Sequence, residues 1–203
     1  MIRLAARQLL PEDPYKPKIE EVENHAFLKK LLCCFFCWKV VPSLEEELGR
    51  ADVVLGQSFG LRKTSPGDSN KALAKIAKRL HKKYELPLIL QWEIADCLPK
   101  LSKAGIIREH RVKGKYLDTY EALSQAKAIC DRYGWKKAVI LAHPHHYWRC
   151  VMIAKKLGFI TVAIDTYRVP YDMLSIQKWT KTSLRFIPYD FAARINHLFR
   201  GLI

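Results

Sequence analysis

Three histidines and an arginine directly follow an apolar run at residues 138–142, and these residue types bind anions and transfer protons. His143, His145 and His146 stand close together, and Arg149 comes four residues after His145. Imidazole changes its charge near neutral pH, and a guanidinium group binds oxyanions through a fork of donors. Because residues four apart share one side of a helix, we predict that His145 and Arg149 bind an oxyanion, with His145 or His146 as the acid–base residue. The open alternative is that the histidines only cap and pack this helix.

The segment after the apolar run at residues 87–90 carries a second pair of polar side chains. Side chains alternate along a strand, so Gln91 and Glu93 should share one face. In that position Gln91 would contact a ligand and Glu93 would act as a general base. A charged residue at an exposed strand end is the alternative interpretation of Glu93.

Two further candidate segments stand at the ends of other elements. Gly56, Gln57 and Ser58 follow a short apolar run, and a small residue there lets backbone N–H groups approach a phosphate or carboxylate. Thr119 and Glu121 open a predicted helix and are ligand-binding candidates, although helix capping explains both residues equally well. The chain contains neither the glycine fingerprint of dinucleotide sites nor a P-loop, so both of these nucleotide-binding classes are excluded.

The histidines also raise the question of a metal site. His143 and His145 would supply two ligands, and Glu93 or Glu121 would supply a third. A zinc site needs three or four converging ligands, and none of the usual zinc spacings occurs in the chain. We therefore predict no metal site, and the sequence assigns no cofactor.

From residue 51 onward, short apolar strands alternate with helices, and this order positions the candidate residues. Such alternation predicts an α/β fold with a mainly parallel sheet and helices on both faces. The carboxyl ends of parallel strands lie along one edge, where ligands bind, so the four candidate segments should meet there. The predicted strands cover residues 52–55, 87–90, 106–107, 139–142 and 160–164, and the predicted helices include 94–104, a helix capped by Asp118, 146–157 and 188–199.

The first 50 residues differ from the rest in composition, which predicts two parts. Residues 1–50 are predicted to be a helical extension, and residues 51–203 are predicted to be the α/β domain. A short helix at 44–49 should begin with a capping box, since Ser43 and Glu46 have the spacing in which each satisfies an N–H group of the other.

The cysteines and the longest apolar run bear on location. Cys33, Cys34 and Cys37 lack a second pair of metal-ligand spacing, so core packing is the preferred interpretation. The run at residues 31–41 is shorter than the roughly 20 residues that span a bilayer. No signal-peptide pattern opens the chain. We therefore expect a cytoplasmic protein without a transmembrane segment, and a peripheral membrane association of this run is an open alternative.

The formal net charge of +15 predicts anionic partners. A nucleotide-like or phosphate-bearing small molecule would fit the candidate pocket. The alternative is a non-catalytic module that docks onto nucleic acid or an anionic membrane surface through the lysine-rich helix face at residues 71–83. The sequence determines neither an oligomeric state nor a reaction.

Three motifs resemble the YdcF-like family, a bacterial group that includes SanA-like proteins and whose domain has no assigned function. They are residues 51–56, residues 117–122, and residues 138–149 followed by Lys-Leu-Gly-Phe at 156–159. The resemblance covers roughly residues 51 to 165 and implies a Rossmann-like three-layer sandwich with polar residues lining a pocket.

Carried onto this chain, the family pattern implies pocket roles for five residues, namely Gly56, Thr119, Glu121, His146 and Arg149. The chain departs from the pattern in two places. His143 stands where the family usually has a small polar residue, and the second strand ends in Gln91-Trp-Glu93 where the family often has Ser-Gly. We also expect no counterpart of the membrane anchor that many relatives have. These departures bear on the substrate and on an envelope location.

Overall fold

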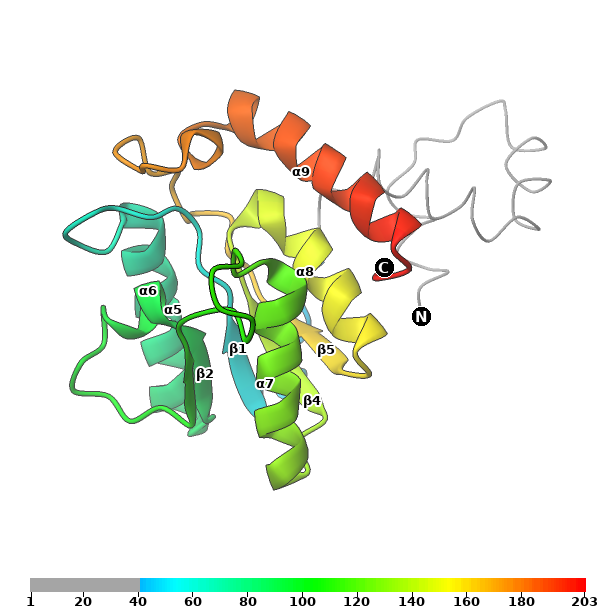
Figure 1. Cartoon of the computed structure of the whole chain (residues 1–203). Coiled ribbons are helices and arrows are strands. Elements are labelled where there is room, and N and C mark those ends of the chain that lie inside the picture. Colours follow the sequence, from blue (N-terminus) through cyan, green and yellow to red (C-terminus); the bar gives the residue numbers. More distant parts are fainter. Residues whose placement is uncertain (1–40) are drawn as a thin grey trace, which may run out of the picture. The chain divides into compact units, whose positions relative to one another are not determined.

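The computed structural model describes residues 41–203, which belong to one compact unit. Its centre is a sheet of five parallel strands in the order β3-β2-β1-β4-β5 (Figure 1). This order is that of a Rossmann-like fold, so the predicted α/β class is confirmed. The strands are β1 (Val53–Gly56), β2 (Leu88–Gln91), β3 (Gly105–Ile107), β4 (Lys137–Leu141) and β5 (Ile160–Ala163).

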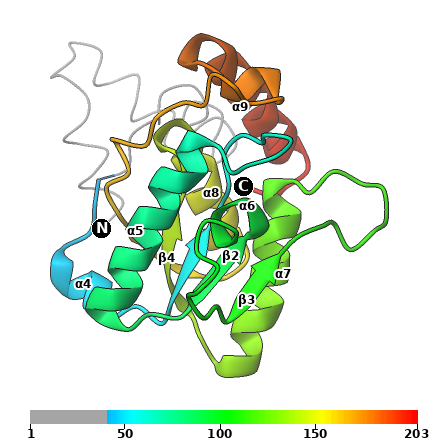
Figure 2. The ribbon, with the colours of Figure 1, turned by 90° about the vertical axis from the view of Figure 1, so that its left-hand side faces the viewer.

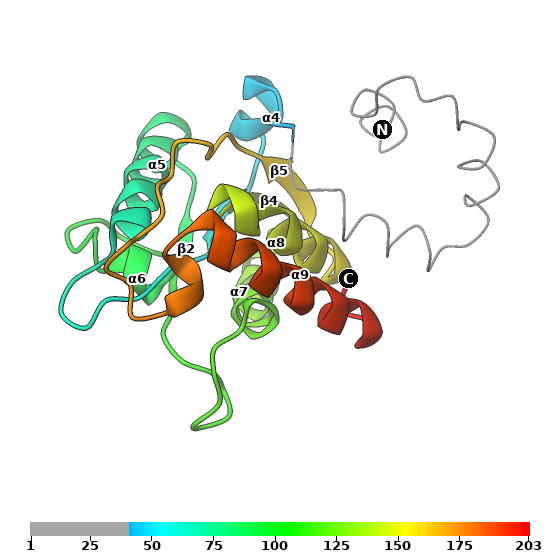
Figure 3. The ribbon, with the colours of Figure 1, turned by 90° about the horizontal axis from the view of Figure 1, so that it is seen from above.

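Helices cover both faces of this sheet. Helices α5 and α6 lie on one face and α7 and α8 lie on the other, as Figures 1 and 2 show together. The C-terminal helix α9 packs on α8 at the carboxyl end of the strands (Figure 3). The helices are α4 (Glu45–Gly49), α5 (Asp68–Tyr84), α6 (Trp92–Ala95), α7 (Thr119–Tyr133), α8 (Pro144–Lys156) and α9 (Ser183–Phe199), with one 3₁₀ turn, η1 (Lys178–Thr180).

The central strands are apolar except for Gln91 at the end of β2, because both of their faces are covered. Every residue of β1 and of β2 is buried, and a strand buried on two sides loses the polar alternation of a half-exposed strand. Helix α5 turns its leucines and alanines to this core, while its lysines lie on the outer side. The buried strands therefore fix the position of the carboxyl edge of the sheet, where the candidate site residues were predicted to lie.

Two predicted helix ends are confirmed in α7. The carboxylate of Asp118 accepts a hydrogen bond from the backbone N–H of Glu121 at 2.8 Å, and so caps the first turn. Gly134 ends the helix with a positive φ of 71°, the left-handed conformation that glycine adopts without strain.

Two other local predictions are wrong. Helix α6 ends at Ala95 and does not continue to residue 104, because a proline at position 99 disfavours helical geometry before it and the backbone N–H of Ala104 joins the sheet through Leu88. Ser43 does not cap α4. Its hydroxyl accepts a hydrogen bond from the N–H of Ala163 at 3.0 Å and so ties the chain to the end of β5.

The described part of the chain contains three free cysteines, Cys97, Cys130 and Cys150. The cluster Cys33, Cys34 and Cys37 and most of the predicted helical extension lie outside the described residues. None of the helices within residues 41–203 is long and apolar enough to cross a membrane.

Candidate functional site

A pocket of about 210 Å³ lies at the carboxyl edge of the sheet. The strand order reverses between β1 and β4, and in open α/β sheets ligands bind where this reversal opens a crevice. Six of the predicted site residues line the pocket, namely Ser58, Gln91, Glu93, Thr119, His146 and Arg149. They come from the ends of β1 and β2 and from the first turns of α7 and α8.

The floor of the pocket is built around a buried carboxylate that the sequence-based prediction did not include. Asp190 of α9 is fully buried and accepts hydrogen bonds from Nε of Arg149 at 2.7 Å and from Nε of Arg194 at 2.6 Å. Burial alone would raise the pKa of Asp190, but the nearby imidazole of His146 and the charges of Arg149 and Arg194 outweigh burial and hold the pKa below its usual range. The hydrogen bond from Nε of Arg149 to Asp190 therefore fixes the Arg149 side chain.

Arg149 contacts His146, and this pairing differs from the predicted one with His145. Its Nη2 lies 3.1 Å from Nδ1 of His146, and the other ring nitrogen, Nε2, lies 3.3 Å from the hydroxyl of Thr119. Burial, together with the charge of Arg149, lowers the pKa of His146 to about 4. His146 is therefore neutral at pH 7.

The end of β2 supplies a second polar group to the pocket. The side-chain oxygen of Gln91 accepts hydrogen bonds from the backbone N–H of Ser58 at 2.7 Å and from the Ser58 hydroxyl at 3.2 Å. Glu93 is close by, and among the described residues its buried Oε2 atom has no hydrogen-bond partner. Burial raises the pKa of Glu93. The predicted general-base role of Glu93 stays a prediction.

Gly56 and Gln57 shape the end of β1 without lining the pocket. A Cβ atom on Gly56 would lie 2.5 Å from Cδ2 of Leu90, so glycine lets the Leu90 side chain pack directly against β1. The N–H of Gln57 donates to the carbonyl of Leu141 at 2.8 Å and extends the pairing of β1 with β4. Both residues thereby determine where Ser58 enters the pocket.

His143 and His145 face an aromatic cluster beside the pocket. The ring of His143 stacks on Phe59 with centroids 3.8 Å apart, and its side chain is buried. Burial lowers the pKa of His143, and the nearby His145 and His146 lower it further. Nδ1 of His145 lies 2.8 Å from the Tyr171 hydroxyl. Acid–base roles for His145 and ligand binding by His143 stay predictions.

Glu121 holds a loop that forms one wall of the pocket. Its carboxylate accepts hydrogen bonds from Nε and Nη2 of Arg111 at 2.7 and 2.9 Å and from the Arg111 backbone N–H at 3.1 Å. These contacts lower the pKa of Glu121. Tyr116 and Leu117, which lie between Arg111 and α7, line the pocket. Glu121 therefore supports the wall of the pocket and is not among the residues that line it.

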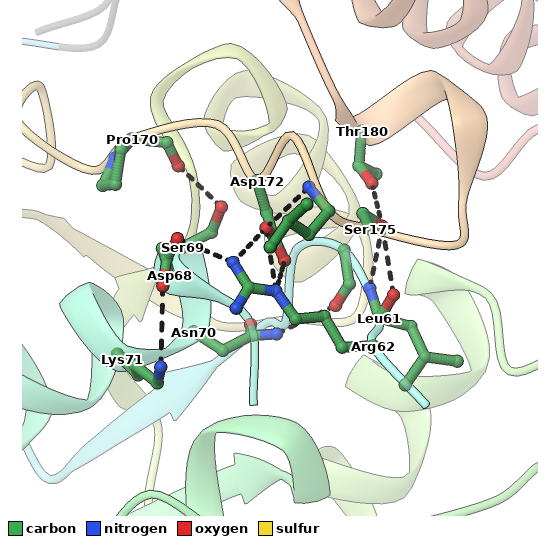
Figure 4. A network of polar contacts seen from close by, with 12 residues as sticks. Leu61, Arg62, Asp68, Ser69, Asn70, Lys71, Pro170, Asp172, Ser175 and Thr180 are labelled. Carbon is green, nitrogen blue, oxygen red and sulfur yellow. Dashed lines mark hydrogen bonds and ion pairs between the residues drawn. The ribbon is translucent and has the colours of Figure 1, made fainter. Parts of the chain in front are cut away.

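The segment at residues 165–182, which we name the strap, contributes Gln177, Trp179 and Thr180 to the lining of the pocket. Asp172 of the strap is fully buried, and its carboxylate accepts hydrogen bonds from Nε and Nη2 of Arg62 at 2.5 to 3.0 Å (Figure 4). The hydroxyl of Ser175 accepts hydrogen bonds from the backbone N–H of Leu61 at 3.1 Å and from the hydroxyl of Thr180 at 2.8 Å. These bonds tie the strap to the loop after β1.

The strap and α9 bring in aromatic residues that the sequence-based prediction also missed. Trp179 and Tyr189 stack with centroids 5.0 Å apart, and both line the pocket together with Trp92 and Tyr116. The spacing of Asp190 and Arg194, an acidic and a basic residue four apart in one helix, was the available signal for the buried carboxylate. The sequence carried no comparable signal for the strap.

Comparisons of the chain with protein-family models, with curated proteins and with solved structures find no match. Within residues 41–203, His, Cys, Asp and Glu side chains do not gather in any group of three or more that could hold a metal ion.

Replacing Asp190 by asparagine should lower the free energy of unfolding by about 3–5 kcal/mol, because it removes the carboxylate that two buried arginines share. Urea denaturation measures the change. The matched control is Asp131→Asn, whose exposed pairing with Lys127 should contribute less than about 1 kcal/mol. Equal stability of the two variants would contradict a structural role for Asp190.

Stability should also fall when the pH is lowered from about 6.5 to about 4. The pKa values of His146 and His197 are both lowered to about 4 by burial, so the unfolded chain takes up these protons before the folded chain does. His146 alone should account for about 3 kcal/mol. Urea denaturation at pH 7, 5.5 and 4.5 measures how steeply the free energy of unfolding falls with pH. The fall should be smaller in His146→Gln than in the wild type. A wild-type stability that does not change with pH would argue against lowered pKa values for these histidines.

Proposed function

We propose that the pocket binds a small anionic molecule, phosphate-bearing or nucleotide-like, at the carboxyl edge of the sheet. One observation carries this proposal. The Arg149 side chain is only 7% exposed and lines the pocket, and Asp190 and His146 occupy its Nε and Nη2 atoms. Among the described residues Nη1 has no hydrogen-bond partner, so it is available to a ligand. A buried guanidinium group with an unused donor favours an oxyanion.

The surroundings of Arg149 support the same class of ligand. Thr119 is the first residue of α7, where unpaired N–H groups and the positive end of the helix dipole attract an anion. The aromatic walls at Trp92, Trp179 and Tyr189 would contact a planar group such as a nucleotide base. An anionic group at one end and a flat group at the other is the pattern of a nucleotide.

The resemblance to the YdcF-like family supports this pocket as well, and membership of that family is part of the proposal. Of the positions that the resemblance singles out, Thr119, His146 and Arg149 line the pocket, whereas Gly56 and Glu121 support its walls. A reaction in this pocket would use Glu93 to move a proton, since its carboxyl group has a raised pKa and an unpartnered buried oxygen.

Arg149→Lys tests the proposal. Lysine keeps a positive charge beside Asp190 but lacks the second arm of the fork, so the dissociation constants of inorganic phosphate and of a nucleoside monophosphate should rise about tenfold or more. Isothermal titration calorimetry measures both constants. The matched control is Arg132→Lys at the exposed end of α7, which should leave them unchanged. Equal affinity of Arg149→Lys and the wild type would refute the role of Arg149.

A second candidate function is docking onto nucleic acid or an anionic membrane surface. The observation that favours it is a shallow groove on α5 lined by five cationic side chains, Lys75, Lys78, Arg79, Lys82 and Lys83. Such a face attracts polyanions and releases their counterions. The groove lies on the outer side of α5, away from the pocket residues, so the two functions can be tested separately.

The double variant Lys75→Glu/Lys78→Glu should weaken binding to duplex nucleic acid and to anionic vesicles at least tenfold at low salt, while leaving phosphate affinity within about twofold. Fluorescence anisotropy at 50 and 200 mM salt and vesicle co-sedimentation provide the measurements. Polyanion binding that is independent of salt, or that is lost in Arg149→Lys instead, would count against this surface.

A further inference from the structure

The hydrogen bonds around His146 determine which of its ring nitrogens carries the proton. A guanidinium group only donates, so Nδ1 of His146 must accept the hydrogen bond from Nη2 of Arg149 at 3.1 Å. The carboxylate of Asp190 lies 3.6 Å from the same nitrogen, which is too far to draw a proton onto Nδ1 by a hydrogen bond. The neutral ring therefore carries its proton on Nε2.

This tautomer fixes the role of the Thr119 hydroxyl. Nε2–H of His146 donates to Oγ1 of Thr119 across 3.3 Å, so the hydroxyl hydrogen of Thr119 has to point elsewhere. Thr119 lines the pocket, and the pocket is the side on which a ligand can receive that hydrogen. Asp190 orients Arg149, Arg149 orients His146, and His146 orients Thr119.

From this chain of contacts we infer that His146 is a positioning residue which makes the Thr119 hydroxyl a donor to the ligand, and that the subsite formed by Thr119 and Arg149 binds an oxyanion of the ligand. The inference rests on the proposed function and specifies its ligand. The subsite presents Nη1 of Arg149, the hydroxyl of Thr119 and the first N–H groups of α7, all of which are donors.

The same geometry assigns no proton transfer to His146. If Thr119 acted as a nucleophile, Nε2 of His146 would have to be unprotonated in order to take the hydroxyl proton. The ring proton would then be on Nδ1, where it would face the N–H donor of Arg149. The groups that face the ring are Arg149 on its own helix and Asp190 and Arg194 on α9, and in this arrangement the neutral ring is favoured. The acid–base chemistry of the pocket is left to Glu93.

The first experiment measures the tautomer directly in the wild-type chain without ligand. Nitrogen-15 NMR of histidine-labelled protein at pH 7 should show a protonated Nε2 and an unprotonated Nδ1 for His146, with the signals assigned by their loss in His146→Gln. A protonated Nδ1 overturns the inference, even if the pocket binds phosphate.

The second experiment measures the affinity of phenyl phosphate at pH 8 by calorimetry. Glutamine at position 146 retains an acceptor for Arg149 and a donor for Thr119, so His146→Gln should bind within about threefold of the wild type, whereas His146→Ala should lose about tenfold. Thr119→Ser should likewise bind within about threefold, and the isosteric Thr119→Val should lose about tenfold.

Two results of this series overturn the inference. The first is that Thr119→Val binds phenyl phosphate as tightly as the wild type does. The second is that His146→Gln and His146→Ala lose the same affinity although both variants are folded. A wild-type chain that binds no phenyl phosphate overturns the proposed function and the ligand assignment with it. In that case the NMR result still tests the tautomer of His146 independently of the proposed function, because it is measured without any ligand.

Discussion

The buried carboxylate of Asp190 is the group on which the candidate site depends. It accepts hydrogen bonds from two arginines on two helices, α8 and α9, and so joins the C-terminal helix to the end of the sheet. A buried charge persists only when it is paired and fully hydrogen-bonded. The position of Arg149, and through it those of His146 and Thr119, follows from this requirement.

The rest of the pocket is held in the same manner, by polar contacts between segments that are distant in the chain. Arg62 and Asp172 fasten the strap to the loop after β1, and Arg111 and Glu121 fasten the wall that contains Tyr116. A loop has few apolar contacts of its own, so charge-assisted hydrogen bonds replace them. The pocket therefore combines a rigid parallel sheet with walls that ion pairs keep in place.

Much of the fold could be predicted from the sequence because local patterns dictate it. The strands are short apolar runs between turn residues, and the ends of α7 follow from the capping by Asp118 and the left-handed conformation of Gly134. Predictions failed where a distant contact overruled a local preference. Ser43 has the spacing of a capping box but bonds to Ala163 across the sheet, and α6 is short because the chain must return to pair with β2.

The sequence by itself determined which polar residues stand at the ends of the strands, and parallel strands bring those ends to one edge. It also determined that Arg149 lies in the first turns of a helix with two histidines. Only the tertiary structure decided that Arg149 pairs with His146, although His145 also shares its helix face. The reason is that sequence spacing fixes the angle between side chains on one helix, whereas the packing of α9, with Asp190, selects which side of that helix is buried and charged.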